Sequence, residues 1–382
     1  MSGTAARLTR LDVRDFRNLA HVALTPPAEG MVVIGENGAG KTNLLEAIYY
    51  LQILRSARGV RDQDLVRFGA DAFHIAARAE ADHCHEIGVG FERAGRRKRI
   101  RLDGAIPERL SDALGALPSV MFSPDDVDLI AGAPNARRRF LDIMLALTTR
   151  GYLAALQRYR AALARRNAAL RMVSRGERGG RGTSSIAIWE PALAEHGAVI
   201  WSARREWVDS VADRLTSLCH DIGEAGAVAV RYSSSLLPST MASADVASAL
   251  VSALEDKRDH DARRGLTHAG PHRDDLVITL DGRDVRTFGS AGQQRSAAIA
   301  LRMLEAATFR ERSGRAPVFL LDDPFAELDV RRAARILGML TARGGDQQII
   351  LAVPRESDIP NELTSLERLR VAGGVVTPFA SV

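Results

Sequence analysis

A glycine-rich turn between an apolar strand and a helix constrains the fold of this chain most. The run Met31–Ile34 predicts a short buried strand, and it leads directly into the glycine-containing stretch Gly35–Gly40. Beyond this stretch the apolar residues take helical spacing along one stripe, at Leu44, Leu45, Ile48, Leu51 and Leu54. Strand, glycine turn and helix in this order predict a mixed α/β fold.

The turn itself matches a phosphate-binding loop, over Gly35, Glu36, Asn37, Gly38, Ala39, Gly40, Lys41 and Thr42. Its glycines let backbone N–H groups wrap a β-phosphate, and the start of the following helix adds positive potential. Lys41 is expected to reach the β- and γ-phosphate oxygens, and Thr42 to supply an oxygen to Mg²⁺. Lysine is rare in this chain, since 49 of its 52 basic residues of the two types are arginines and only three are lysines. The loop therefore predicts an ATP site with Mg²⁺.

A second apolar run, Val318–Leu321, ends in the carboxylates Asp322 and Asp323. Such a run could simply be a buried strand that ends in an acidic turn. In a chain with a phosphate-binding loop it instead predicts the Walker B element of an ATPase. Asp322 is expected to bind Mg²⁺, directly or through water, and Asp323 to polarise the attacking water. The candidate catalytic residues are therefore Lys41, Asp322 and Asp323.

Ser290 precedes a segment with helical spacing and occupies its cap position. With Gly292 and Gln293 it forms an SxGQ pattern that resembles the ABC signature motif. In that superfamily the motif contacts the γ-phosphate held by the other subunit, as a helix N-terminus that completes an anion site. The stretch 326–329, Ala-Glu-Leu-Asp, resembles the D-loop, which crosses the dimer interface there. The resemblance implies an ATP-bound homodimer.

The 382 residues exceed the usual size of one hydrophobic core, so we expect two lobes. Long Ala/Leu/Arg segments begin near Ser111 and continue to about Phe288. We expect residues 1–110 and 289–382 to form an ABC-type ATPase head and residues 111–288 to form a mostly helical inserted lobe. The glycine-rich break at 175–185 is expected to let two long helices fold back on each other.

More than half of the chain separates Gly35 from Ser290. This spacing is longer than in transporter ATPases and lacks the very long coiled coils of SMC proteins. Almost the whole chain resembles the RecF family of bacterial recombination mediators. The segments that carry the resemblance are LTRLDVRDFRNL, VIGENGAGKTNLLEAIYYL, FSPDDVDLIAGAPNARRRFLD, RYRAALARRNAAL, THAGPHRDDL, SAGQQR and LLDDPFAELD.

The RecF resemblance implies ATP-dependent dimerisation with slow hydrolysis. It also implies DNA binding at gaps or single-strand to double-strand junctions, and cooperation with RecO and RecR in loading RecA. The chain departs from the wider ABC pattern at three places. No glutamine occurs in the stretch 120–126, Pro354 stands where a switch histidine would follow the last apolar run, and Asp323 replaces the usual glutamate. A carboxylate one methylene shorter fits a slow switch.

Arginine clusters are the candidate DNA contacts, because phosphate binding needs only aligned cations. The net charge of +5 permits a nucleic acid partner without requiring one. The clusters comprise Arg137, Arg138 and Arg139, then Arg158, Arg160, Arg165 and Arg166, and a basic run at 96–101. The same arginines could instead form a solvated face, and Arg137–Arg139 could pair with Asp142 in the core.

No run approaches the roughly 18 apolar residues of a membrane span. Cys84 and Cys219 have no CxxC partner and fit a reducing compartment. We therefore expect a soluble cytoplasmic protein without a membrane partner. Two other functions remain open, a transporter-type motor subunit whose insert holds a membrane partner's helix, and an ATP-regulated interaction protein without direct DNA contact.

Overall fold

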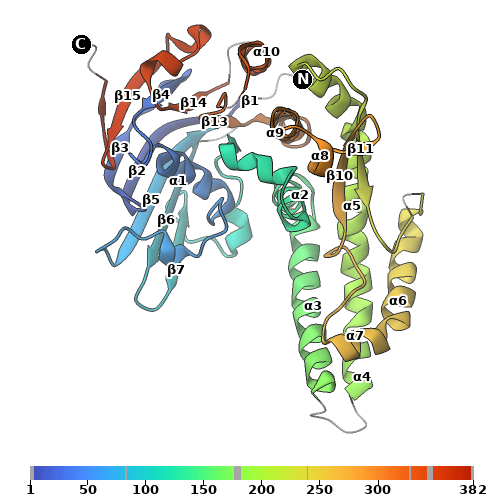
Figure 1. Cartoon of the computed structure of the whole chain (residues 1–382). Helices are drawn as coiled ribbons and strands as arrows, with labels where there is room; N and C mark the ends of the chain where they lie inside the picture. Colours follow the sequence, from blue (N-terminus) through green and yellow to red (C-terminus); the bar gives the residue numbers. More distant parts are fainter. Residues whose placement is uncertain are drawn as a thin grey trace. The chain divides into compact units, whose positions relative to one another are not determined.

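The computed structural model describes residues 4–81, 84–175, 182–238, 240–326, 328–341 and 347–379 (Figure 1). The chain forms two compact units. Unit 1 consists of Met1–Asp126 and Ala298–Val382, and unit 2 of Val127–Ala297. Unit 1 is thus assembled from both ends of the chain, with unit 2 inserted in its sequence.

Unit 1 contains a six-stranded sheet in the order β16-β15-β4-β14-β13-β8. The strands are β4 (Gly30–Ile34), β8 (Ser119–Phe122), β13 (Val318–Asp322), β14 (Ile349–Val353), β15 (Glu367–Ala372) and β16 (Val375–Pro378). All neighbours are parallel except the β15–β16 pair. Every residue of β4, β8, β13 and β14 is buried, as in parallel strands covered on both faces. The mixed α/β class expected from the sequence is confirmed.

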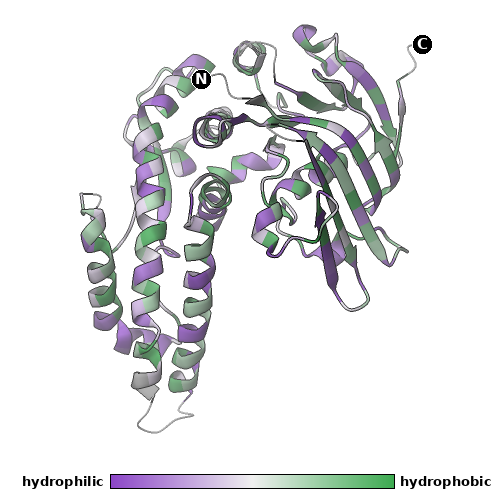
Figure 2. Cartoon of the chain, turned by 180° about the vertical axis from the view of Figure 1, so that it is seen from behind, coloured by the Kyte–Doolittle hydropathy of each residue, from purple (hydrophilic) through white to green (hydrophobic). Residues whose placement is uncertain are grey.

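A second sheet of unit 1 is antiparallel, in the order β3-β2-β5-β6-β7. Its strands are β2 (Arg7–Phe16), β3 (Leu19–Leu24), β5 (Ala72–Glu80), β6 (Cys84–Glu92) and β7 (Arg97–Leu102). Hydrophobic and hydrophilic bands alternate along these strands, which is typical of a sheet with one buried face (Figure 2). The short β1 (Thr4–Ala5) and β12 (Arg315–Ala316) form a separate parallel pair.

The helix α1 (Lys41–Ile53) contacts strands of both sheets, namely β8, β13 and β14 in one and β2, β5 and β6 in the other. It is buried on nearly every side, including the polar Glu46 and Gln52. Arg17 forms an ion pair of 3.0 Å with Glu46, and the Ser119 hydroxyl donates to Gln52 Oε1 over 2.7 Å. The apolar stripe expected from the sequence is therefore only part of the buried surface of this helix.

Unit 2 is mostly helical. Its helices are α2 (Pro134–Thr148), α3 (Tyr152–Ser174), α4 (Gly182–Ala187), α5 (Glu190–Ile222), α6 (Val246–Asp256), α7 (Arg258–Arg264) and α8 (Val285–Phe288). The long α3 and α5 pack against each other, and α5 also packs against β9 (Val228–Ser233). β9 pairs with β10 (Asp275–Leu280), which pairs with β11 (Arg283–Asp284). Part of the expected break, 176–181, lies outside the described residues.

Two further helices follow, α9 (Ala291–Ser313) and α10 (Val330–Thr341). α9 begins in unit 2 and continues into unit 1, because the boundary of the units falls after Ala297. None of the helices in the described part of the chain combines the length and apolar character that a membrane crossing requires.

The unit boundaries lie later than the sequence texture suggested. We expected the insert at 111–288, whereas the compact unit runs from Val127 to Ala297. The reason at the first boundary is β8, whose Ser119 pairs with Val318 of β13, so this stretch belongs to the parallel sheet. Texture cannot reveal this, because a strand of four residues is too short to show a period.

Replacing Gly30 by alanine is expected to lower the free energy of unfolding by about 2–4 kcal/mol. Gly30 has φ +113°, and a Cβ there would lie 1.7 Å from the Ile349 carbonyl oxygen. Urea unfolding measures the change. Gly338→Ala is the matched control, since that helical glycine has no atom near an added Cβ, and it should gain roughly 0.5–1 kcal/mol. Equal stability of both variants would contradict the proposed backbone clash.

Candidate functional site

The glycine turn joins β4 to α1 and folds around the ammonium group of Lys41. The Nζ atom donates to the carbonyl oxygens of Gly35 over 2.6 Å and Glu36 over 3.0 Å. Gly38 and Gly40 have φ +80° and +121°, a region open to glycine with little strain. Burial lowers the pKa of Lys41, and the charges of Asp322 and Asp323 oppose this shift. The loop is thus closed on its own lysine.

Asn18, in the turn between β2 and β3, holds this loop through hydrogen bonds. Its Nδ2 donates to the carbonyl oxygens of Gly38 (3.3 Å) and Ala39 (3.1 Å). Its Oδ1 accepts from Asn43 Nδ2 over 2.8 Å, and a Cβ on Gly40 would lie 2.8 Å from the same oxygen. Sequence reasoning missed Asn18 as a site residue, because nothing local in LTRLDVRDFRNL shows which loop the side chain will face.

Asp322 and Asp323 follow the apolar strand β13, as the sequence predicts. Asp322 is buried, which raises its pKa, and a hydrogen bond from the Thr42 hydroxyl partly offsets that shift. Asp323 adopts φ +45°, which aspartate tolerates better than most residues, and its N–H donates to the Ala352 carbonyl over 2.9 Å. The backbone of Asp323 therefore holds this strained turn against β14, and this fixes where the Asp323 side chain begins.

One cavity brings the four predicted chemical groups of unit 1 together. It is lined by Lys41, Thr42, Asp322 and Asp323, with Asn37, Gly38, Gly40, Asn43, Arg58 and Pro124. Two acidic groups face a lysine and a loop of backbone N–H groups, which is the donor set that a Mg²⁺–triphosphate needs. Thr42 and Asp322 fit the metal, because a hydroxyl and a carboxylate oxygen already meet there in a hydrogen bond.

Arg58 is a cavity residue that the sequence analysis did not single out. Its Nε lies 3.8 Å from a carboxylate oxygen of Asp125, and its charge lowers the pKa of Asp322. It is the one arginine among the residues that line the cavity. No spacing in the stretch 55–60 marks it, so its position depends on the packing of the segment after α1.

The loop after β8 occupies the place where the missing glutamine was noted. Pro124 lines the cavity, while Asp126 is buried and pairs with Arg302 of α9 over 2.7 Å. Arg302 also binds Glu305 over 2.7 Å, and the charges of both acids hold the pKa of Arg302 well above its usual value against the effect of burial. An acidic loop that is bound by Arg302 therefore occupies the position at which the wider ABC pattern has a glutamine.

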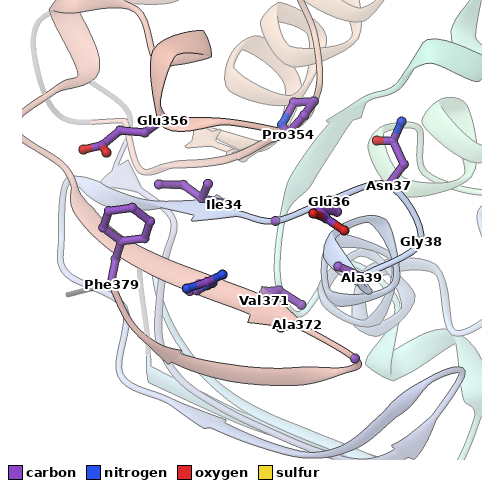
Figure 3. A pocket seen from close by; sticks show the side chains of 13 residues that line it. Ile34, Glu36, Asn37, Gly38, Ala39, Pro354, Glu356, Val371, Ala372 and Phe379 are labelled. Atoms are coloured by element: carbon purple, nitrogen blue, oxygen red, sulfur yellow. The ribbon is translucent and has the colours of Figure 1, made fainter. Parts of the chain in front are cut away.

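A second cavity lies against the other side of the glycine turn (Figure 3). Glu36 and Asn37 face it from the turn, Pro354 and Glu356 from the segment after β14, and Phe379 from the end of β16. The pyrrolidine ring of Pro354 offers no donor. The hydrogen bond that a switch histidine would make has no counterpart at this position.

Ser290 and Gln293 cap the N-terminus of α9 reciprocally. The Gln293 N–H donates to Ser290 Oγ over 3.3 Å, and the Ser290 N–H donates to Gln293 Oε1 over 2.9 Å. The cap is exposed, as expected for a surface that would receive a ligand. Ser290, Gly292 and Gln293 belong to unit 2, whereas the residues that line the Lys41 cavity belong to unit 1.

The D-loop expectation is partly outside the described residues, since Glu327 is not among them. Asp329 caps α10, because its Oδ1 accepts from the N–H groups of Arg331 and Arg332, each over 3.0 Å. Val330 is 86% exposed directly after it. An apolar side chain so open to water is unusual at a helix start.

The structure corrects the DNA-contact prediction for Arg137 and Arg166. Arg137 is 3% exposed and forks onto Asp275, with distances of 2.7 and 2.8 Å. Arg166 is fully buried between Glu190 (3.0 Å) and Asp261 (2.7 Å). Neither guanidinium can reach a phosphate, because each is held inside unit 2 by carboxylates.

The other predicted arginines are more open. Arg158, Arg160 and Arg165 are exposed on α3, and Arg138 and Arg139 are half-buried on α2. Arg165 lies over the Trp189 ring at 5.0 Å. The suggested core pair with Asp142 is wrong for Arg137, because Asp142 is instead bound by Arg160 and Arg204, over 3.0 and 2.7 Å.

Comparison with known proteins places this geometry in a family. The family model described as the RecF/RecN/SMC N terminal domain matches residues 7–365. The DNA replication and repair protein RecF of Anaeromyxobacter sp. (strain K) is 39% identical, over 98% of this chain and all of its own length. The protein of the same description from Geotalea daltonii is 34% identical, over 97% and 99%.

Solved structures agree. One described as the recombination mediator protein RecF-ATPrS in the RecFOR pathway has a TM-score of 0.89 at 28% identity and covers all of both chains. The Smc head domain of Pyrococcus furiosus has a TM-score of 0.54 at 16% identity, over 97% of this chain and 95% of that one, a likeness of fold alone. The chain therefore belongs to the RecF/RecN/SMC N-terminal domain family and, within it, to the RecF branch of DNA replication and repair proteins.

Proposed function

We propose that this chain closes as an ATP-bound homodimer on gapped or junction DNA, in recombinational repair and replication restart. It helps load RecA onto single strands, together with RecO and RecR, and slow hydrolysis of ATP is the release switch. RecO and RecR as partners are supported by the RecFOR pathway named for the solved relative. RecA as client and the cytoplasm as location follow from the family resemblance.

One observation carries the proposal. Lys41, Thr42, Asp322 and Asp323 line a single cavity of unit 1, and Ser290 and Gln293 of unit 2 cap an exposed N-terminus of α9. The chain thus holds a hydrolytic half-site and a helix N-terminus of the type that binds anions. A second copy supplies the missing half for each, so ATP is the bond between two subunits.

The residues have separate tasks in this mechanism. Lys41 leaves its two loop carbonyls and neutralises the β- and γ-phosphate oxygens. Thr42 and Asp322 hold Mg²⁺, which shields the phosphate charge when bound. Asp323 orients and deprotonates the attacking water, and Arg58 faces the charge that builds up on the transferred phosphoryl group.

Sedimentation with ATP, ADP or no nucleotide, each with and without a gapped duplex, tests the proposal. We expect Mg²⁺-ATP to convert monomers to dimers and to tighten DNA binding in a fluorescence titration, while ADP does neither. An ungapped duplex of equal length is the control. Dimers that ignore DNA would favour the ATP-regulated interaction protein, and monomers under every condition would reject the proposal outright.

A further inference from the structure

Unit 2 contains a cavity lined with arginines that no step above uses. Its lining residues come from α2, α3, α5 and the segment before β10, and Figure 1 shows these elements. Its volume is about 230 Å³, below the 300–1,000 Å³ typical of small-molecule sites. The lining comprises Asn135, Arg138, Arg139, Asp142, Leu156, Tyr159, Arg160, Leu163, Ile200, Arg204, Pro271 and His272. It can seat one charged group with a few adjoining atoms, and not a whole nucleotide.

The lining carries an excess of positive charge. It holds the guanidinium groups of Arg138, Arg139, Arg160 and Arg204 against the single carboxylate of Asp142. That carboxylate accepts at Oδ1 from Arg204 (2.7 Å) and from the Tyr152 hydroxyl (2.6 Å), and at Oδ2 from Arg160 (3.0 Å). Its single charge acts on Arg138 as well, and it cannot balance four guanidinium groups.

The other polar groups around the cavity do not remove the excess. Burial lowers the pKa of His272 to about 4, so its ring is neutral near pH 7. The Tyr159 hydroxyl lies 2.5 Å from His272 Nδ1, and these two side chains form an uncharged wall. Among neighbouring acids, Asp275 pairs with Arg137 over 2.7 Å and Asp274 accepts from the Tyr232 hydroxyl over 2.8 Å, so each also binds a group outside the lining.

Arg138 illustrates the excess of positive charge in the lining. Its one hydrogen bond within the described residues is to the Asp274 carbonyl oxygen, over 2.8 Å. Burial, together with the nearby charge of Arg204, lowers its pKa, and the charges of Asp275, Asp142 and Asp274 oppose this shift. A guanidinium that is partly desolvated beside another cation is stabilised by an anion arriving in the cavity.

The arginines of the lining lie on separate helices. Arg138 and Arg139 lie on α2, Arg160 lies on α3, and Arg204 lies on α5. Arginines from three helices thus approach the cavity from different directions. That arrangement suits a tetrahedral oxyanion better than a planar carboxylate, which one bidentate arginine can satisfy.

We propose that this cavity binds a phosphate group of the DNA backbone, so that unit 2 makes its own sequence-independent contact with DNA. The proposal rests on the proposed function in taking DNA as the ligand. The phosphate contacts in this proposal are Arg138 and Arg160, with Arg139 beside them. Arg158 and Arg165 are not among these contacts, because they do not line the cavity.

Three double variants test the choice, and each removes two charges: Arg138→Gln with Arg160→Gln, Arg158→Gln with Arg165→Gln, and the exposed α7 pair Arg263→Gln with Arg264→Gln as control. Binding of a gapped duplex is measured against salt concentration with Mg²⁺-ATP present. The cavity pair should reduce the salt slope by about 1 for each phosphate that it no longer neutralises, with weaker binding of every sequence. The α7 pair should leave the slope unchanged.

A lysine version of the cavity pair separates loss of charge from loss of folding. Arg138→Lys with Arg160→Lys should keep most of the salt slope, because charge remains, while affinity falls without the planar guanidinium forks. An unchanged slope in the glutamine cavity pair, with parental DNA binding intact, overturns the cavity proposal and leaves the proposed function standing. Absence of DNA binding by the parental protein rejects both. If oligoglutamate of matched charge displaces DNA from the parental protein but not from the cavity pair, the site serves an acidic protein segment instead.

Discussion

Replacing Asp323 by asparagine is expected to slow ATP hydrolysis by about 10²–10⁴-fold while ATP remains bound, since a positioned general base contributes about that much. The amide has nearly the same shape, and asparagine tolerates the φ of +45° at this position, so the turn after β13 should persist. Single-turnover hydrolysis and the affinity for a fluorescent ATP analogue separate the chemical step from binding.

Two companion variants sharpen this test. Asp323→Glu keeps a carboxylate at this position and places it one methylene closer to the water. This variant is expected to hydrolyse ATP at least as fast as the parent. Asp213→Asn, at an exposed position on α5, is the matched control for loss of one charge. If Asp323→Asn retained more than half of the parental rate, another group would have to be the base, and the assignment of Asp323 would be wrong.

Exchanging Ser290 for arginine should abolish ATP-driven dimerisation and leave ATP binding to the subunit's own loop intact. The bulky cation would invade the γ-phosphate position of the partner, and the reciprocal cap with Gln293 would be lost at a cost of about 1 kcal/mol. Lys41→Met fails in the opposite half of the site. Each variant alone should be inactive.

Mixing the two variants is expected to restore at most about half of the parental ATPase rate, since each mixed dimer holds one intact site of two. The warrant is that a helix N-terminus stabilises the γ-phosphate only when placed in trans. Native mass measurement counts the mixed dimers. An inactive mixture in which mixed dimers are abundant would refute the composite site, and with it the mechanism.

The sequence marked most of the residues that line the Lys41 cavity, because their pattern is local. A phosphate-binding loop needs glycines, a lysine and a hydroxyl at fixed offsets, and the strand before it and the helix after it follow from periodicity. The run that ends in Asp322 and Asp323 is local in the same way. The cap position of Ser290 was predicted in the same way, and the structure adds Gln293 as its reciprocal partner within one helical turn.

The arginines show where such reasoning stops. Composition gave no means to separate Arg137, which forks onto a carboxylate 138 positions away, from its neighbour Arg138, which lines a cavity. Whether a cation is a buried structural pair or is open to a ligand depends on which carboxylate the fold places opposite it. That choice is made by long-range packing and leaves no pattern in the residues around the arginine.

Local patterns in the chain thus predicted the strand before the glycine turn, the helix α1 after it, and the type of chemistry that Lys41, Thr42, Asp322 and Asp323 can perform. Long-range packing made the sheet parallel, placed Asn18 against that loop and Arg58 in its cavity, and gathered arginines around a cavity of unit 2. The physical reason is range: offsets along one turn or strand are written in the chain, whereas partners from distant segments meet only when the sheets and helices pack.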